Sequence, residues 1–266
     1  MSSQPSRLLP ASSFAFPIDF SLSKVLSSVS SLKTLSDEAS LKMSNFLHTT
    51  LLYWLFNGLG GQQIFKLRKD LEDYDHVKKL VEDYLQEVKR EQIDSKKGSF
   101  HHQDDHLDET PENHQYSSLN DFIHRLTSQC IPPDLKMHAQ AEALKTCFKM
   151  NSLLSSSSEE GSLDASQHFP LNELGLNFQV QQIQTFIEKH CSFQAQAFQE
   201  KVHVLEVYAA FTAILEYLSA EILELSSSHL SSSSSDPKCL SVEALEKGVL
   251  SDSALLDLPY SVLMLL

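Results

Sequence analysis

Residues 209–225 read AAFTAILEYLSAEILEL, with neither glycine nor proline in the run. The spacing predicts a helix from Val202 to Leu225 with hydrophobic side chains on more than one face. A typical surface helix buries a single hydrophobic stripe, so this helix needs neighbours on several sides. The segment therefore predicts an all-α protein in which a long central helix is surrounded by other helices.

The composition of the whole chain agrees with an all-α fold. Its 266 residues include only seven glycines and nine prolines, which is few for a β-rich fold with many tight turns. The formal net charge is −14, from 21 Lys and Arg against 35 Asp and Glu. This charge has the wrong sign for neutralising phosphates, so direct binding to nucleic acid is disfavoured.

Serine-rich stretches divide the chain. The first 40 residues contain 13 serines and no sustained hydrophobic period, which is typical of a disordered tail. We expect a disordered tail over 1–44, a first helical half over 45–152, a linker over 153–170 and a second helical unit over 171–266. Within these units the hydrophobic spacing predicts helices at 67–93, 117–130, 135–150, 177–190, 200–227 and 242–250.

No arrangement of residues predicts catalysis, a cofactor or a metal site. The four cysteines form no CxxC pair, which argues against a zinc cage and fits a reducing, intracellular setting. The segment His101–His106 is rich in His and Asp, but its loop-like context predicts a solvated loop rather than fixed ligands. Leu51–Phe56, the densest apolar run, is too short to span a membrane. We therefore expect a soluble, non-enzymatic chain in the cytoplasm, or alternatively in the nucleus.

Two segments of the second unit resemble core histone 2A. Gly175–Val180 reads GLNFQV, similar to the GLxFxV start of that histone's first helix. The run AAFTAILEYLSAEILEL is close to its central helix AAVLEYLTAEILEL, with Leu215–Leu218 and Ala220–Leu225 intact. The resemblance implies a histone fold, in which a short helix, a long central helix and another short helix follow each other.

Other segments resemble the histone-like N-terminal region of the Son of sevenless family of Ras guanine-nucleotide exchange factors. DFIHRL at 121–126 with Cys130 is similar to that family's FIHKLL…C segment, and DSALLDL at 252–258 is similar to its DKVLMDMF. The resemblance covers about residues 116–260 and implies two histone folds packed as an intramolecular pseudodimer. The exchange chemistry of that family lies in a later domain, so the resemblance implies no catalysis within these residues.

The resemblance also implies which residues form the core and which face a partner. The residues expected in the histone-fold core are Phe178, Val180, Ile183, Leu215, Leu218, Ile222, Leu225 and Leu245. Carboxylates that match the acidic patch of histone 2A, or that share its direction at 100° per residue, are Glu206, Glu216, Glu221, Glu224 and Asp252. Such a face binds arginine from a basic peptide through charge-assisted hydrogen bonds. A solvated polar face on an acidic protein explains the same charges.

The basic residues of both families are largely missing. The first helix of histone 2A projects arginines toward DNA, whereas the matching residues 181–190 retain only Lys189. Residues 113–266 hold eight Lys or Arg against eighteen Asp or Glu. DNA wrapping and the binding of anionic lipid, which the Son of sevenless resemblance would otherwise imply, both depend on such cations. The charge balance therefore disfavours both activities for this chain.

Two functions follow from these resemblances. The first is a histone-fold protein-interaction and regulatory module, similar to the autoregulatory N-terminal region of a Son of sevenless-type exchange factor in small-GTPase signalling. Its partner is a histone-fold half in the same chain or in another protein, or downstream exchange-factor domains if the chain is a fragment. The alternative is a divergent histone 2A-like chromatin subunit that pairs with another histone and contacts DNA in a nucleosome-like complex. The first function requires 67–93 and 116–150 to pack against 177–258.

Overall fold

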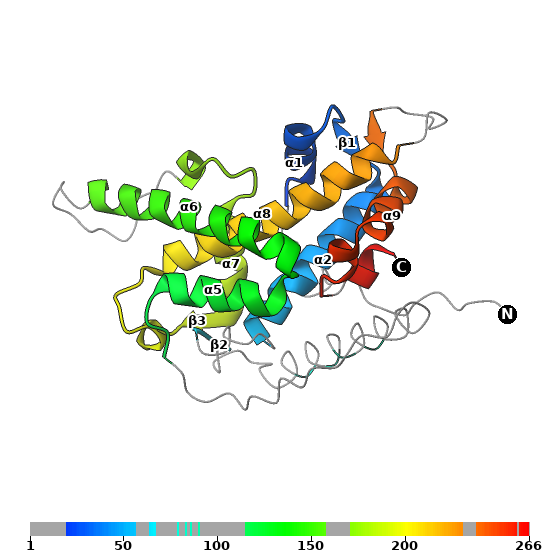
Figure 1. Ribbon diagram of the computed structural model, residues 1–266. Helices are drawn as coiled ribbons and strands as arrows, with labels where there is room; N and C mark the ends of the chain where they lie inside the picture. Colours follow the sequence, from blue (N-terminus) through cyan, green and yellow to red (C-terminus); the bar gives the residue numbers. More distant parts are fainter. Residues whose placement is uncertain are drawn as a thin grey trace.

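The structure is a computed structural model that describes residues 20–56, 64–67, 79, 83, 86, 90, 115–157, 171–230, 238–259 and 261–265. Most of these residues are helical and the strands are short, which agrees with the all-α class expected from the sequence. The longer helices are α1 (Leu22–Val29), α2 (Asp37–Phe56), α5 (Leu119–Cys130), α6 (Pro133–Ser157), α7 (Val180–His190), α8 (Val204–Ser228) and α9 (Val242–Ser251) (Figure 1). The strands and short helical turns are β1 (Thr34–Leu35), β2 (Phe65–Leu67), β3 (Cys191–Phe193), β4 (Cys239–Leu240), α10 (Ser253–Leu256), η3 (Leu171–Leu174), η4 (Ala195–Ala197) and η5 (Ser261–Met264).

Two parts of the chain repeat the same order of elements. Residues 20–67 form the first repeat, with α1, β1, α2 and β2, and residues 178–240 form the second, with α7, β3, α8 and β4. Each repeat begins with a buried phenylalanine two residues before its first helix, Phe20 before α1 and Phe178 before α7. The two ring centroids lie 5.3 Å apart, so the starts of the two repeats meet.

The two repeats complete each other's strand pairs. β1 pairs in parallel with β4, with Thr34 opposite Cys239, and β2 pairs antiparallel with β3, with Phe65 opposite Phe193. The start of α2 therefore lies near the end of α8, and the end of α2 lies near the start of α8. The two long helices consequently run in opposite directions, as Figure 1 shows. Aromatic rings join them, since Trp54 and Phe211 lie 5.6 Å apart between centroids.

Helix α8 is buried on nearly all sides. Residues 207–215 are buried without interruption, and α1, α2, α6, α7 and α9 all pack against the helix. The buried hydroxyl groups of Thr212, Ser219 and Ser226 each donate to the carbonyl oxygen four residues earlier, at 2.6–2.7 Å. These bonds satisfy polar groups that no solvent reaches. The structure confirms a long central helix surrounded by other helices.

Helices α5 and α6 lie outside the two repeats and cover α8. Ser118 caps α5, because its Oγ accepts a hydrogen bond from the Asp121 N–H at 3.2 Å. Ile131 and Pro132 separate the two helices, and Pro133 begins α6, since proline is tolerated in the first turn of a helix but not in its interior. α6 packs on α8, which it crosses at an angle in Figure 1.

Helices α8 and α9 make a very close contact. A Cβ atom on Gly248 would meet Ser226 Oγ and would lie 2.6 Å from Ser226 Cα. That separation is too short for real Cβ atoms, so this position in α9 requires glycine. Lys42 Nζ forms an ion pair with Glu246 Oε1 at 2.6 Å, which ties α9 to α2 of the first repeat.

The expected disordered tail over 1–44 is wrong for residues 20–44. Leu22, Val25 and Leu26 are buried at helical spacing on α1, whereas Ser23 and Ser27 occupy its exposed face. The expected boundary between 44 and 45 also falls inside α2. The serine content hid an amphipathic helix, because serines can fill its polar face without interrupting the hydrophobic one.

Other expectations fall partly outside the described residues. The expected helix 67–93 is described only in part. Leu67 belongs to β2, and most of the other residues lie outside the described part. The residues that are described as helical are all exposed, and these are Lys79, Asp83, Gln86 and Arg90. Of the expected linker 153–170, the residues up to Ser157 continue α6, and 158–170 lie outside the described part.

The residues expected in the core lie between α7, α8 and α9. All but one are buried, with at most 3% of the side chain exposed, and these are Phe178, Val180, Ile183, Leu215, Leu218, Ile222 and Leu245. Leu225 is half-buried and packs against the edge of the same core.

Candidate interaction surfaces

The acidic residues expected on one face do not form a single cluster. Glu206 and Glu224 point in the same direction from α8, but the helix between them separates them by about 27 Å. Three of the five expected carboxylates accept hydrogen bonds from backbone N–H groups, and only Glu221 and Glu224 remain without such a role among the described residues. A shared angle around the helix therefore does not by itself bring these carboxylates onto one surface.

Glu206 and Asp252 act as helix caps. Glu206 Oε2 accepts a hydrogen bond from the His203 N–H at 2.9 Å, while His203 Nδ1 accepts one from the Leu205 N–H at 3.2 Å. Together these bonds form a capping box at the start of α8. Asp252 Oδ1 accepts from the Ala254 N–H at 2.7 Å and so caps α10. Both carboxylates satisfy donors that have no partner within the helix.

Glu216 fixes the start of α7 against α8. Its Oε2 accepts a hydrogen bond from the Phe178 N–H at 2.8 Å, and its Oε1 accepts one from Asn177 Nδ2 at 3.0 Å. Burial raises the pKa of Glu216 above its ordinary value, and the two hydrogen bonds oppose that rise. This carboxylate therefore has an internal partner.

Glu221 and Glu224 remain as a small acidic pair on α8. Glu221 is half-buried and is hydrogen-bonded to Tyr217, whereas Glu224 is exposed. Burial, followed by the Glu221 carboxylate, raises the pKa of Tyr217. Residues three apart on a helix lie on the same face, so these two side chains are neighbours. Glu224 is the exposed member of the expected acidic face, and the other four carboxylates are half-buried.

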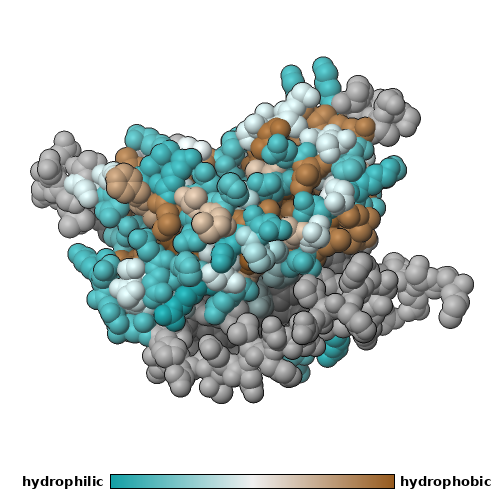
Figure 2. Space-filling view, in the orientation of Figure 1, coloured by the Kyte–Doolittle hydropathy of each residue, from teal (hydrophilic) through white to brown (hydrophobic). Residues whose placement is uncertain are grey.

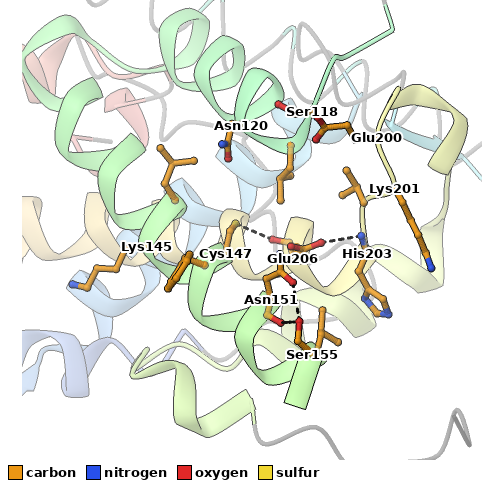
Figure 3. Close-up of a pocket in the computed structure, with 15 residues that line it drawn as sticks. Ser118, Asn120, Lys145, Cys147, Asn151, Ser155, Glu200, Lys201, His203 and Glu206 are labelled. Carbon is orange, nitrogen blue, oxygen red and sulfur yellow. Dashed lines mark hydrogen bonds between the residues drawn. The ribbon is translucent and has the colours of Figure 1, made fainter. Parts of the chain in front are cut away.

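A groove of about 770 Å³ lies at the other end of α8 (Figure 3). The start of α5, residues 144–155 of α6 and the loop 200–203 form its walls. Its hydrophobic lining consists of Leu119, Leu144, Phe148, Leu154 and Val202. Its charged lining consists of Lys145, Glu200, Lys201 and Glu206. The volume falls within the range of ligand and peptide sites.

Backbone contacts hold the two walls of the groove in place. The Tyr116 N–H donates to the Ala197 carbonyl, and the Gln199 N–H donates to the Tyr116 carbonyl, both at 2.8 Å. The rings of Tyr116 and Phe198 lie 5.8 Å apart between centroids. The start of α5 and the loop before α8 are therefore connected by the backbone on one side of the groove.

The thiol in the groove has no features of a nucleophile. Cys147 Sγ donates to the Glu206 carbonyl oxygen at 3.4 Å, and burial raises the pKa of the thiol to about 12. A thiol with this pKa stays protonated at neutral pH, whereas the thiolate is the reactive form. Burial likewise raises the pKa values of Cys130 and Cys191 to about 12. Cys147 therefore presents no thiolate to the groove at neutral pH.

Within the described ranges, no three His, Cys, Asp or Glu side chains are grouped closely enough to hold a metal ion. The segment His101–His106, which the sequence analysis considered as a source of ligands, lies outside those ranges. None of the helices that the structure describes is long and apolar enough to cross a membrane.

The groove was not predicted from the sequence, although one of its walls has a recognisable hydrophobic pattern. Met137, Ala141, Leu144 and Phe148 recur at intervals of four, three and four residues on α6. The same helix buries a different face, which includes Ala139, so it has hydrophobic residues on two sides. The opposite wall depends on tertiary contacts that no local pattern reveals.

A scan against protein-family models gave no match for this chain, and a search of curated proteins gave none either.

Proposed function

We propose that the chain is a double histone-fold interaction and regulatory module, similar to the autoregulatory N-terminal region of a Son of sevenless-type Ras exchange factor. In this role it acts in the cytoplasm, binds protein partners and performs no chemistry of its own. The reciprocal strand pairing between the two repeats is the observation that carries the proposal. Each repeat supplies a short helix followed by a long one, as a histone fold does, and each completes a strand pair of the other.

The pairing favours a partner within the chain over a separate histone. The hydrophobic faces of α8 are covered by α1, α2, α6 and α9, all from the same polypeptide. A free histone 2A-like subunit instead needs a second chain to cover its central helix, because an exposed helix of this kind presents a large apolar patch. The alternative of a chromatin subunit rests on the sequence likeness at 175–180 and 209–225.

The charge of α7 supports protein binding rather than DNA binding. The stretch 181–190 carries Lys189 and Glu188, so it offers no net positive charge toward phosphate. Affinity for duplex DNA near physiological salt depends on the number of phosphates neutralised. The isolated chain is therefore proposed to bind no duplex DNA under these conditions.

Mass determination in solution, with and without histone 2B, tests the proposal. We expect a monomer whose mass by light scattering is unchanged by an equimolar amount of histone 2B. Histone 2A mixed with the same histone 2B serves as the positive control for pairing. A stable one-to-one complex of the chain with histone 2B would overturn the proposal in favour of the chromatin subunit.

A further inference from the structure

One of the described methionines lies on the surface, whereas the other three lie in the core. Met137 on α6 is 67% exposed, and Met43, Met150 and Met264 are each 0% exposed. Met1 lies outside the described residues. The thioether sulfur is the atom of methionine that oxidants attack. Exposure therefore decides which of these side chains reacts while the protein is folded.

Helix geometry separates the two methionines of α6. Met137 and Met150 are 13 residues apart, which places them about 140° apart around the helix axis. Met150 belongs to the buried face of the helix, together with Leu135 and Ala139, and α6 packs on α8. Met137 lies on the outer side. The same helix therefore carries one protected and one accessible thioether.

Met137 begins a row of hydrophobic side chains on the outer face of α6. Ala141, Leu144 and Phe148 follow it at intervals of four, three and four residues, and Phe148 is 76% exposed. Figure 2 shows hydrophobic surface, interrupted by hydrophilic surface, over the region that α6 occupies in Figure 1. The other three side chains are hydrocarbons, which mild oxidants leave intact. Met137 is therefore the member of this row whose polarity a single oxygen transfer changes.

The cysteines of the described chain are poorer targets for the same oxidants, with one exception. Burial raises the pKa values of Cys130, Cys147 and Cys191 to about 12, so these thiols stay protonated at neutral pH. Cys239 on β4 is half-buried, and an oxidant can approach its sulfur. A test of Met137 must therefore follow Cys239 separately.

We propose that Met137 is a redox-sensitive modification site, which hydrogen peroxide or an organic hydroperoxide oxidises to methionine sulfoxide in the folded protein. A lone pair of the thioether sulfur attacks one peroxide oxygen, and the S–O bond forms as the O–O bond breaks. The proton of the attacked oxygen passes to the other oxygen, which leaves as water or as an alcohol. The sulfur loses two electrons and the peroxide gains them. Methionine sulfoxide reductases reverse the change, so the modification is reversible.

The sulfoxide changes the outer face of α6 while the fold is preserved. The modified side chain is polar, so the hydrophobic row loses its first member. At the exposed Met137 the added oxygen displaces no packed neighbour, whereas at Met150 it would be forced into the core. The inference goes beyond the proposed function. It does not depend on whether the repeats are histone folds, so a complex with histone 2B would leave it intact.

Peptide mapping by mass spectrometry tests the selectivity on the full chain. The folded protein is treated with hydrogen peroxide, and the sulfoxide fraction of each methionine is followed over time. Met137 should react at least about tenfold faster than Met150, its control on the same helix, because a buried thioether reacts only when the fold opens. Met43 and Met264 should be protected like Met150. In concentrated guanidinium chloride all four rates should become similar.

Two outcomes of the mapping would overturn the proposal. In the first, Met150 reacts as fast as Met137 in the folded chain. In the second, Met137 reacts only after unfolding, which would show that other parts of the protein shield its sulfur.

The variant Met137→Leu separates the effect of the sulfoxide from oxidation elsewhere. Peroxide should lower the retention of the wild-type chain on a hydrophobic-interaction column, and it should leave the retention of Met137→Leu nearly unchanged. Cys239→Ser is the matched control and should respond as the wild type does. An equal loss of retention in Met137→Leu and the wild type would overturn the proposal, because another residue would then be responsible.

Two further measurements test whether the modification is reversible and confined to the surface. Treatment of the oxidised wild-type chain with methionine sulfoxide reductases and dithiothreitol should restore its retention. The melting temperature should be the same before and after oxidation of Met137. A sulfoxide that the reductases do not remove, or a clear fall in the melting temperature, would overturn the proposal of a reversible surface site.

Discussion

The two long antiparallel helices have the same place in the fold but different interiors. α8 has a nearly continuous hydrophobic middle. α2 instead buries His48, Thr49 and Thr50 in its middle. His48 Nδ1 lies 2.8 Å from the Ser44 carbonyl oxygen, and Thr49 Oγ1 donates to the Asn45 carbonyl at 2.7 Å. The difference shows that two repeats can share burial and pairing while their side-chain chemistry differs.

The first helices of the repeats are also fixed in different ways. In the first repeat the Phe20 ring packs edge-on against His48 of α2, with centroids 4.9 Å apart. In the second repeat the Phe178 N–H donates to Glu216 of α8. An aromatic contact in one repeat thus takes the place of a charged hydrogen bond in the other. Three measurements of stability compare the contributions of the two repeats.

The largest expected effect comes from cavities in the two central helices. Leu218 in α8 is 1% exposed and Leu51 in α2 is fully buried. If both helices belong to one core, Leu218→Ala and Leu51→Ala should each lower the free energy of unfolding by about 2–5 kcal/mol. Urea denaturation measures this, with the half-exposed Leu41→Ala as the control. An effect confined to Leu218→Ala would show that α2 adds little to the core.

A smaller effect is expected at the close contact between α8 and α9, which has no described counterpart in the first repeat. Gly248→Ala should lower the free energy of unfolding by about 1–3 kcal/mol, because the new methyl group must displace the Ser226 backbone. Combining Gly248→Ala with Ser226→Gly should not restore stability, since the backbone rather than the hydroxyl alone blocks the space. Thermal melting of both variants checks this. Full recovery in the double variant would mean that only the side chain of Ser226 limits the contact.

The smallest effect concerns the carboxylate that fixes the second repeat. Because burial raises the folded-state pKa of Glu216, the fold favours its neutral form. The stability that this form contributes is complete below the ordinary pKa of 4.5 and is lost as the pH rises through the folded value. Glu216→Gln stays neutral, so its stability relative to wild type should increase between pH 4 and pH 7.

Denaturation at both pH values measures the change in this relative stability. Glu216 is half-exposed, so the change should be below about 1 kcal/mol. Glu224→Gln, at an exposed position on the same helix, is the control and should show a smaller change. Equal changes in the two variants would show that the hydrogen bonds of Glu216 offset its burial completely.

The second repeat could be predicted from the sequence, whereas the first could not. In residues 209–225 the apolar residues are so dense that only a buried helix accommodates them. In α1 the hydrophobic spacing is equally regular but extends over only eight residues among many serines. The high serine content therefore led to the prediction of a disordered tail, although the hydrophobic spacing of α1 is that of a helix. The pairing of β1 with β4 has no local signal, because it depends on segments at opposite ends of the chain.

The candidate surfaces show a related limit. Ideal helix geometry gives Glu206 and Glu224 one direction, but angles give no information on their separation along the axis. They also give no information on which carboxylates accept hydrogen bonds from nearby backbone N–H groups, as Glu216 and Asp252 do. The Met137–Phe148 spacing was readable, but its exposure depends on which face of α6 packs against α8.

The strand pairing between the repeats has a consequence for biosynthesis. Thr34 pairs with Cys239, so this contact closes a loop of about 200 residues, and contacts of this length slow folding. At ribosomal rates of about 5–20 residues per second, α2 is synthesised roughly 10–40 s before β4. During that interval the hydrophobic face of α2 has no α8 to pack against. Newly made chains are therefore expected to depend on chaperones, and nascent chains held close together on one messenger are expected to exchange repeats with each other.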